Sequence, residues 1–272
     1  MNEELLIQES AARAFNLQAG EFDILYGNDS IIRYKRERVR EQVESFLAPH
    51  SQILELNAGT GEDAIYFALR GHRVHATDIS GNMLEVLGSK VQSLQLQEAV
   101  TKEKIAYTAL EDLEKQGPYD LIFSNFAGLN CTNRLDKVLD SFAHLLKPGG
   151  YATLVILPRF CLWEFLLLFR GKFRTAFRRF SGKKGTAAKI NDQHFRCWYY
   201  NPSFIRKHLT ATFDVVSLEG LCTVVPPSYI EGFAEKRPRL FHFLKDKENK
   251  WKSRWPWKLI GDYYILTLKK RS

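Results

Sequence analysis

The 272-residue sequence lacks the features that disulfide-bonded, metal-binding and membrane-spanning proteins need. Its four cysteines stand alone without a CxxC pair, which predicts reduced thiols in a cytoplasmic protein rather than disulfides or a zinc site. Its seven histidines show no metal-ligand spacing, so we expect no metal. The longest apolar run, residues 160–169, contains Glu164 and is much shorter than the roughly 20 residues of a membrane span. The first residues do not resemble a signal peptide.

Acidic residues are absent from one long stretch of a chain whose net charge is +8. Between Glu164 and Asp192 there is no Asp or Glu. The basic residues of this stretch are Arg170, Lys172, Arg174, Arg178, Arg179, Lys183, Lys184 and Lys189. Such a stretch indicates an acidic substrate, an anionic membrane surface or nucleic acid as partner. A solvated helix face is the simpler alternative, and composition leaves it open.

Apolar segments of strand and helix type alternate along most of the chain. The expected strands are 53–56, 73–77, 105–108, 119–124, 151–157, 213–218 and 263–268, and the expected helices are 36–47, 62–70, 81–97, 133–146 and 203–209. This alternation predicts an α/β, Rossmann-like, doubly wound, mostly parallel seven-stranded sheet. It stops for about forty residues after residue 157. We therefore expect one domain, 1–272, with an N-terminal helical cap over 1–50 and an inserted segment over 158–200.

Polar residues follow the first two expected strands. Glu55 lies at the end of the first strand, and the glycine-rich loop 57–61 comes next. Asp78 ends the second strand. An acid at that position is placed to accept hydrogen bonds from ribose hydroxyls, because ligands bind at the carboxyl ends of parallel strands. The alternative role for Asp78 is a helix N-cap, which it would share with Ser80.

The glycine loop is compatible with two nucleotide cofactors. Residues 59–64 fit the GxGxxA pattern of a NAD-dependent oxidoreductase, but the pattern begins too far beyond the strand for the tight turn it needs. A carboxylate at Glu55 would also repel a pyrophosphate. The same carboxylate would attract a cofactor that carries a cationic amine and a sulfonium. The segment counted from Glu55 therefore favours the second kind of cofactor.

Residues 55–61 resemble the first motif of class I S-adenosylmethionine-dependent methyltransferases, an acid followed by alternating glycines. The segments 109–113, 119–125 and 145–151 resemble later motifs of that family. The resemblance implies S-adenosyl-L-methionine as cofactor, bound by Glu55, Asn57, Ala58, Gly59, Gly61, Asp78, Ile79, Leu110, Glu111, Asn125 and Phe126. Two positions depart from the pattern, since Asn57 replaces a glycine and Ala109 replaces an acid. Asn tolerates the left-handed backbone, and we expect Glu111 or backbone groups to take the role of the missing acid.

The segment 15–26 resembles the opening of quinone-biosynthesis-type methyltransferases. The resemblance implies that Phe22 and Tyr26 enclose a sulfonium by cation–π contact and that Arg33 meets the cofactor carboxylate. Ordinary packing of the aromatic rings and a surface arginine are the alternative. The segment after the fourth strand, Asn125 to Gly128, lacks the prolines of enzymes that methylate base amino groups.

Residues 162–180 repeat phenylalanine and leucine at steps of three and four, with Arg170, Arg174 and Arg178 beside them. The spacing predicts an amphipathic helix with a basic flank. Three roles are open for this helix, namely a substrate lid, a peripheral membrane contact and a core helix. His194 follows the insertion and is a candidate general base. Aromatic and basic residues also alternate over 250–258, but no nucleic-acid module is recognisable, which ranks nucleic acid behind substrate and membrane.

The sequence thus predicts an S-adenosylmethionine-dependent methyltransferase that acts on a small, partly apolar acceptor at oxygen or carbon. A NAD-dependent oxidoreductase and a non-catalytic S-adenosylmethionine-binding module are the alternatives.

Overall fold

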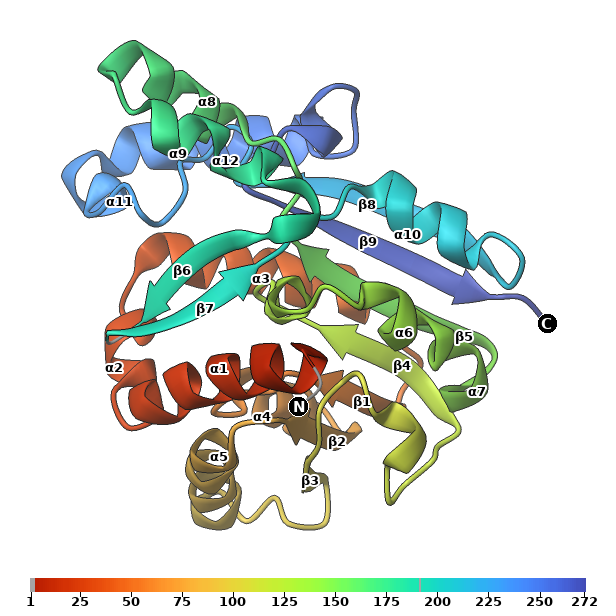
Figure 1. Ribbon diagram of the computed structural model, residues 1–272. Coiled ribbons are helices and arrows are strands. Elements are labelled where there is room, and N and C mark those ends of the chain that lie inside the picture. The colour runs from red at the N-terminus through yellow and green to blue at the C-terminus, as the bar shows by residue number, and fades with distance from the viewer. Residues whose placement is uncertain (1–2, 191) are drawn as a thin grey trace.

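The computed structural model describes residues 3–190 and 192–272 and contains the predicted seven-stranded sheet (Figure 1). Its strands are β1 Gln52–Leu56, β2 Arg73–Asp78, β3 Val100–Lys104, β4 Tyr119–Ser124, β5 Leu146–Ile156, β8 Phe213–Leu221 and β9 Tyr263–Lys270. The strand order is β3-β2-β1-β4-β5-β9-β8. All neighbours from β3 to β5 are parallel, whereas β9 is antiparallel to β5 and β8. The predicted Rossmann-like, mostly parallel fold is confirmed.

Strand β1 lies at the centre of the sheet and buries side chains on both of its faces. Leu54 and Leu56 pack into one hydrophobic cluster, and Ile53 packs into another. Both clusters continue into β4, because neighbouring residues of a strand point to opposite faces. A strand buried on both faces reads as a continuous apolar run, and this explains why β1 and β4 are recognisable in the sequence.

Helices cover the sheet and its carboxyl edge. They are α1 Glu3–Gln18, α2 Phe22–Gly27, α3 Ser30–Glu44, α4 Glu62–Ala68, α5 Gly81–Ser93, α6 Leu135–Asp140, α7 Phe142–Leu145, α10 Pro202–Leu209, α11 Phe233–Lys236 and α12 Pro238–Trp251. The Asp29 side chain caps α3 by accepting from the backbone N–H groups of Ile31 and Ile32. Among the described residues no helix is long and apolar enough to cross a membrane.

Several predicted elements have other bounds in the structure, and the helix expected over 36–47 is α3, Ser30–Glu44. Strand β3 spans 100–104 rather than 105–108, and Ile105 donates its backbone N–H to Asp78 O as the chain leaves the sheet. The single helix expected over 133–146 is two short helices, α6 and α7. The turn after α7 belongs to β5, which already pairs with β4 between Tyr119 and Leu146.

The inserted segment is not the continuous amphipathic helix that its spacing predicted. It contains α8 Leu162–Leu166, η3 Leu167–Arg170, α9 Phe173–Phe177, η4 Arg178–Phe180, η5 Gly182–Lys184 and a hairpin of β6 Thr186–Ile190 and β7 Gln193–Cys197. Gly171 separates the helical turns with a left-handed φ of 69°. Phe195 of the hairpin packs in one cluster with Ala11 and Ala14 of α1. Figure 1 shows α8, α9, α11 and α12 gathered at one end of the molecule, beyond this hairpin.

Candidate functional site

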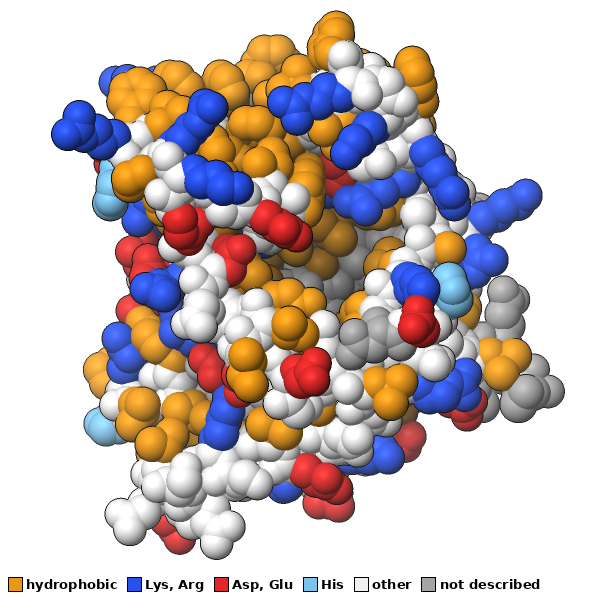
Figure 2. All heavy atoms as spheres, turned by 90° about the vertical axis from the view of Figure 1, so that its left-hand side faces the viewer, with side chains coloured by type: hydrophobic (Ala, Val, Ile, Leu, Met, Phe, Trp, Pro, Cys, Tyr) orange, Lys and Arg blue, Asp and Glu red, His pale blue; other side chains and the backbone are white. Residues whose placement is uncertain are grey.

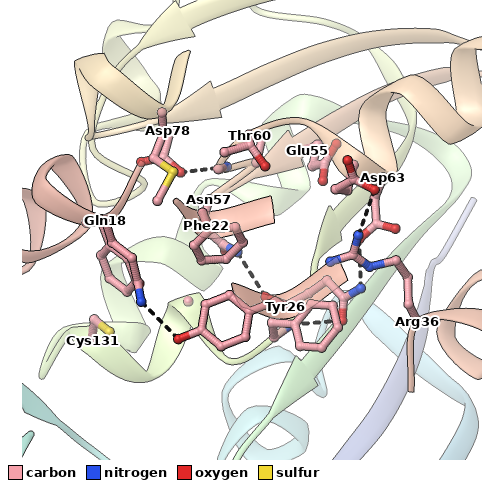
Figure 3. A pocket seen from close by; sticks show the side chains of 18 of the residues that line it. Gln18, Phe22, Tyr26, Arg36, Glu55, Asn57, Thr60, Asp63, Asp78 and Cys131 are labelled. Carbon is pink, nitrogen blue, oxygen red and sulfur yellow. Dashed lines mark hydrogen bonds and ion pairs between the residues drawn. The ribbon is translucent and has the colours of Figure 1, made fainter. Parts of the chain in front are cut away.

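A cavity of about 380 Å³ lies at the carboxyl ends of β1, β2 and β4, under α1, α2 and α3. Its lining residues are Ala11, Phe15, Gln18, Phe22, Tyr26, Ile32, Lys35, Arg36, Glu55, Asn57, Ala58, Gly59, Thr60, Glu62, Asp63, Asp78, Ile79, Met83, Tyr107, Asn125, Phe126, Gly128, Cys131, Ile190, Ser228 and Tyr263. The edge is the one at which α/β sheets bind ligands. Figure 3 shows side chains from four parts of the chain converging on it.

The loop after β1 brings the backbone close to the cavity. Asn57 adopts a φ of 51°, so the departure from glycine is accommodated in the left-handed region. Its side chain donates to Asn125 O at 3.0 Å and accepts from Ser124 Oγ at 2.6 Å. A Cβ on Gly59 would meet no atom within 4 Å. This glycine, which lines the cavity, leaves open space where a ligand can approach the backbone.

Glu55 holds a carboxylate oxygen without a partner at the inner wall of the cavity. The residue is 3% exposed, and its Oε2 has no hydrogen-bond partner. Burial, and next the charge of Asp63, raise the pKa of Glu55 well above its ordinary value. An unsatisfied buried carboxylate is costly. A cationic ligand group in the cavity would remove that cost.

Asp78 uses both carboxylate oxygens to hold neighbouring backbone. Oδ2 accepts from Gly59 N at 2.9 Å, and Oδ1 accepts from Ser80 N at 2.8 Å. Burial raises the pKa of Asp78, and these bonds offset part of that effect. The N-cap of α5 is Ser80, whose Oγ accepts from Met83 N. Asp78 is therefore not the helix cap, and it joins the glycine loop to β2 at the cavity wall.

The turn after β4 has an unusual backbone. Phe126 and Ala127 follow each other with φ values of 49° and 60°. Asn125 supports the turn by donating to Asp63 Oδ2 at 2.8 Å. Consecutive left-handed non-glycine residues store strain, and such strain is typical of functional sites.

Aromatic residues of α1 and α2 form the opposite wall. The rings of Phe22 and Tyr26 are 4.7 Å apart, and Gln18 donates to Tyr26 Oη at 3.0 Å (Figure 3). Thr60 ties this wall to the glycine loop by donating to Asp23 Oδ1 at 2.6 Å. The ligand-facing surface here is largely aromatic.

Five sequence-predicted site residues do not line the cavity. Arg33 is exposed on α3, and Leu110 is fully buried in the hydrophobic core. Glu111 is exposed and pairs with Lys137 at 3.6 Å. Gly61 is the left-handed N-cap of α4, where a Cβ would collide with the side chain of Leu87. His194 is exposed on β7 and lines a separate hollow together with Phe195.

Lys35 and Arg36 line the cavity in place of Arg33, and sequence reasoning missed both. Lys35 is 3% exposed and donates to Ser228 Oγ at 3.1 Å. Burial alone would lower the pKa of Lys35, but Tyr263 and other nearby groups raise it overall. Arg36 pairs with Glu62 at 3.1 Å. The 3.6-residue period of α3 places Ile32 and Arg36 one turn apart on the same side, but the period by itself does not say that this side meets the cavity.

One group of potential metal ligands exists among the described residues, formed by the buried Cys161, Glu164 and Asp262. Arg179 donates to both carboxylates of this group and is itself 2% exposed. The guanidinium therefore already provides the positive charge that the two acids require.

Comparisons with known proteins identify the domain. Residues 53–150 match the family model described as a methyltransferase domain. The hybrid PKS-NRPS synthetase mycA of Thermothelomyces thermophilus is 38% identical over 120 residues, which cover 39% of this chain and 3% of the synthetase. The S-adenosyl-L-methionine-dependent Diels-Alderase iccD of Talaromyces variabilis is 31% identical over 125 residues, 45% of this chain and 42% of that protein. The chain thus spans less than half the length of each of these relatives.

The fold agrees with a solved methyltransferase. The 1,6-didemethyltoxoflavin-N1-methyltransferase of Burkholderia thailandensis, crystallised with S-adenosylhomocysteine, has a TM-score of 0.59 and 15% identity, covering 100% of this chain and 92% of that one. Residues 53–150 of this chain therefore match a methyltransferase domain, and the chain has the fold of class I S-adenosylmethionine-dependent methyltransferases. These matches favour a methyltransferase over the alternative of a NAD-dependent oxidoreductase.

Proposed function

We propose that the protein transfers a methyl group from S-adenosyl-L-methionine to a small, partly apolar acceptor. The observation that carries the proposal is the unpaired Oε2 of Glu55, buried in a cavity that Asp78 and the glycine loop also line. The carboxylates of Glu55 and Asp78 would attract a cofactor with an ammonium group, whereas they would repel a pyrophosphate.

Each cavity wall has a proposed part in holding the cofactor. Asp78 accepts hydrogen bonds from the ribose, and Ile79 with Met83 packs on the adenine. Glu55 receives the ammonium group. Lys35 and Arg36 provide the cations for the carboxylate, the role that the sequence suggested for Arg33. When bound, the cofactor supplies an electrophilic methyl group.

The aromatic wall is the proposed acceptor side. Phe15, Phe22 and Tyr26 offer ring faces to an apolar body, and Ile190 brings the inserted hairpin to the same cavity. The insertion would thereby act as the substrate lid that the sequence suggested. No histidine is among the lining residues of the described chain. We therefore propose an acceptor oxygen or carbon that is acidic enough to ionise without a histidine base, held near the methyl group chiefly by positioning.

Calorimetry and a product assay test the proposal. Titration with S-adenosylmethionine and S-adenosylhomocysteine should show one binding site, and NADH should not bind. Incubation with phenols, β-ketoesters and enols as separate panels should then form S-adenosylhomocysteine with at least one class. Absence of cofactor binding would refute the proposal.

A non-methylating role is the second candidate, favoured by the similarity to a Diels-Alderase that depends on S-adenosyl-L-methionine. In that case S-adenosylmethionine would bind as it would to a methyltransferase, but no S-adenosylhomocysteine would form with any acceptor panel. Product formation separates the two functions.

A further inference from the structure

The inserted segment exposes aromatic rings that the protein interior does not use. Phe169 is 84% exposed, Phe173 62%, Phe177 52% and Phe180 54%. All four lie within twelve consecutive positions, on η3, α9 and η4. The rings of Phe177 and Phe180 contact each other with centroids 6.2 Å apart. Isolated exposed apolar residues are ordinary, but exposed apolar residues that gather together mark an interaction surface. These rings are therefore candidates for burial against another surface.

Unpaired positive charges lie beside the same rings in the sequence. Glu164, the acid nearest in sequence, is 1% exposed and is taken up by Arg178 and Arg179. Arg170, Lys172 and Arg174 are exposed and, among the described residues, form no ion pair. The sequence offers no acid from 165 to 191 to neutralise them. The patch thus combines exposed phenylalanines with three unpaired cations.

This combination limits what can cover the patch. A second copy of the chain would place cations against cations, which opposes self-association. An anionic bilayer satisfies both parts of the patch, because its surface potential attracts Lys and Arg while its interfacial zone takes up aromatic rings. We propose that residues 165–180 dock the protein onto an anionic lipid surface. The short helical turns lie along the surface and do not cross it.

The inserted segment carries the docking surface and also reaches the cavity. Figure 2 shows a hollow below the end of the molecule that α8, α9, α11 and α12 form, with apolar, basic and acidic side chains above it. The insertion that carries the rings continues into β6, whose last residue, Ile190, lines the cavity. Docking therefore places on the lipid a segment that continues into the cavity wall. This position suits a partly apolar acceptor, but the docking itself does not depend on the reaction.

Vesicle co-sedimentation of the full chain tests the proposal. Phosphatidylcholine vesicles are compared with vesicles containing phosphatidylglycerol at low and high salt. We expect binding to the anionic vesicles only, and salt should weaken it. The double variant Arg170→Gln/Arg174→Gln should lower the partition constant about 25-fold, since each charge near the surface contributes about fivefold. The double variant Phe169→Ser/Phe173→Ser should lower it about 100-fold, at about tenfold per ring.

Matched controls lie outside the insertion. Leu69→Ser/Leu94→Ser removes two exposed apolar side chains, and Arg206→Gln/Lys207→Gln removes two exposed cations. Both controls should bind vesicles as the parent does. Equal binding to neutral and anionic vesicles, equal losses in the controls, or no binding would overturn the proposal. Concentration-dependent dimerisation that Phe169→Ser/Phe173→Ser abolishes would instead identify a second copy as the occupant. Cofactor affinity measured on the same variants should stay unchanged, which separates this proposal from the proposed function.

Discussion

Two buried glutamates distinguish the cofactor-side half of the molecule from the insertion. Glu164 in the insertion is 1% exposed and receives hydrogen bonds from Arg178 and Arg179, which lower its pKa although burial by itself would raise it. Glu55 in the sheet is 3% exposed and leaves one oxygen unpaired, and burial raises its pKa. The carboxylate of Glu164 is hydrogen-bonded by arginines of the same chain, whereas Oε2 of Glu55 has no hydrogen-bond partner in the chain.

The difference shows how burial alone misleads about function. A buried acid surrounded by arginines joins segments of the fold, and removing it breaks a network. A buried acid that faces a cavity costs stability, and the fold retains it only if something else compensates. The same Glu-to-Gln substitution should therefore lower stability at Glu164 and raise the stability of the ligand-free protein at Glu55.

The largest effect is expected from Glu164→Gln. The substitution leaves Arg179 buried with only Asp262 as ion-pair partner, and breaking a buried pair costs about 3 kcal/mol. Denaturant unfolding followed by circular dichroism measures the loss. Arg178→Gln is the matched control, since its side chain is 40% exposed and should cost less than about 1 kcal/mol. Equal losses in both variants would contradict the network assignment.

Asp78→Ala should act mainly on ligand binding. Its carboxylate is the proposed ribose partner, and one charge-assisted hydrogen bond contributes about 2 kcal/mol, so we expect an affinity for S-adenosylmethionine roughly 30-fold weaker. Some stability should also be lost, because Gly59 N and Ser80 N lose their acceptor. Calorimetry gives the affinity. Glu111→Gln is the control, and a weaker affinity there would show that the exposed Glu111 contacts the cofactor after all.

Glu55→Gln should stabilise the ligand-free protein and weaken cofactor binding. The folded-state pKa of Glu55 lies above its ordinary value of 4.5, so its contribution to stability is present below that value and is lost as the pH rises through the folded pKa. The gain of the Gln variant should accordingly appear at neutral pH and disappear below pH 4.5. Thermal unfolding across this range measures it. A neutral-pH loss of stability would mean that Glu55 is satisfied without a ligand.

The smallest effect is expected from Phe169→Ser. The ring is 84% exposed, and substitutions at such positions change the free energy of unfolding by less than about 0.5 kcal/mol. Denaturant unfolding checks this, with the buried Ala176→Ser as a contrasting change in the same insertion. A loss near 2 kcal/mol would place the ring in the core and remove it from the docking surface.

Sequence reasoning recovered the sheet because the signals for it are local. Strands β1 and β4 are short apolar runs, and the glycine loop with Asn57 has the turn chemistry that a left-handed backbone requires. Those signals need no knowledge of distant contacts. The predicted cavity residues at these strand ends are Glu55, Asn57, Ala58, Gly59, Asp78, Ile79, Asn125 and Phe126, whereas Thr60, Asp63 and Tyr107, which also line the cavity, were missed.

Sequence periodicity failed where the chain's partners are distant in sequence. The insertion repeats apolar residues with a helical period, yet the left-handed Gly171 separates it into short turns, and Arg178 and Arg179 pair with Glu164. The hairpin that follows packs on α1, about 180 residues earlier in the chain. A short two-stranded hairpin is only marginally stable by itself, so the local sequence did not predict it.

The sequence by itself determined the alternation of strands and helices, the glycine loop and the acids at the strand ends, because each depends on neighbours within a few residues. Only the tertiary structure decided which face of α3 meets the cavity, so that Lys35 and Arg36 line it while Arg33 does not. It also decided that Glu164 is neutralised and Glu55 is not. Pairing of buried charges depends on which segments fold against one another, and no local pattern contains that information.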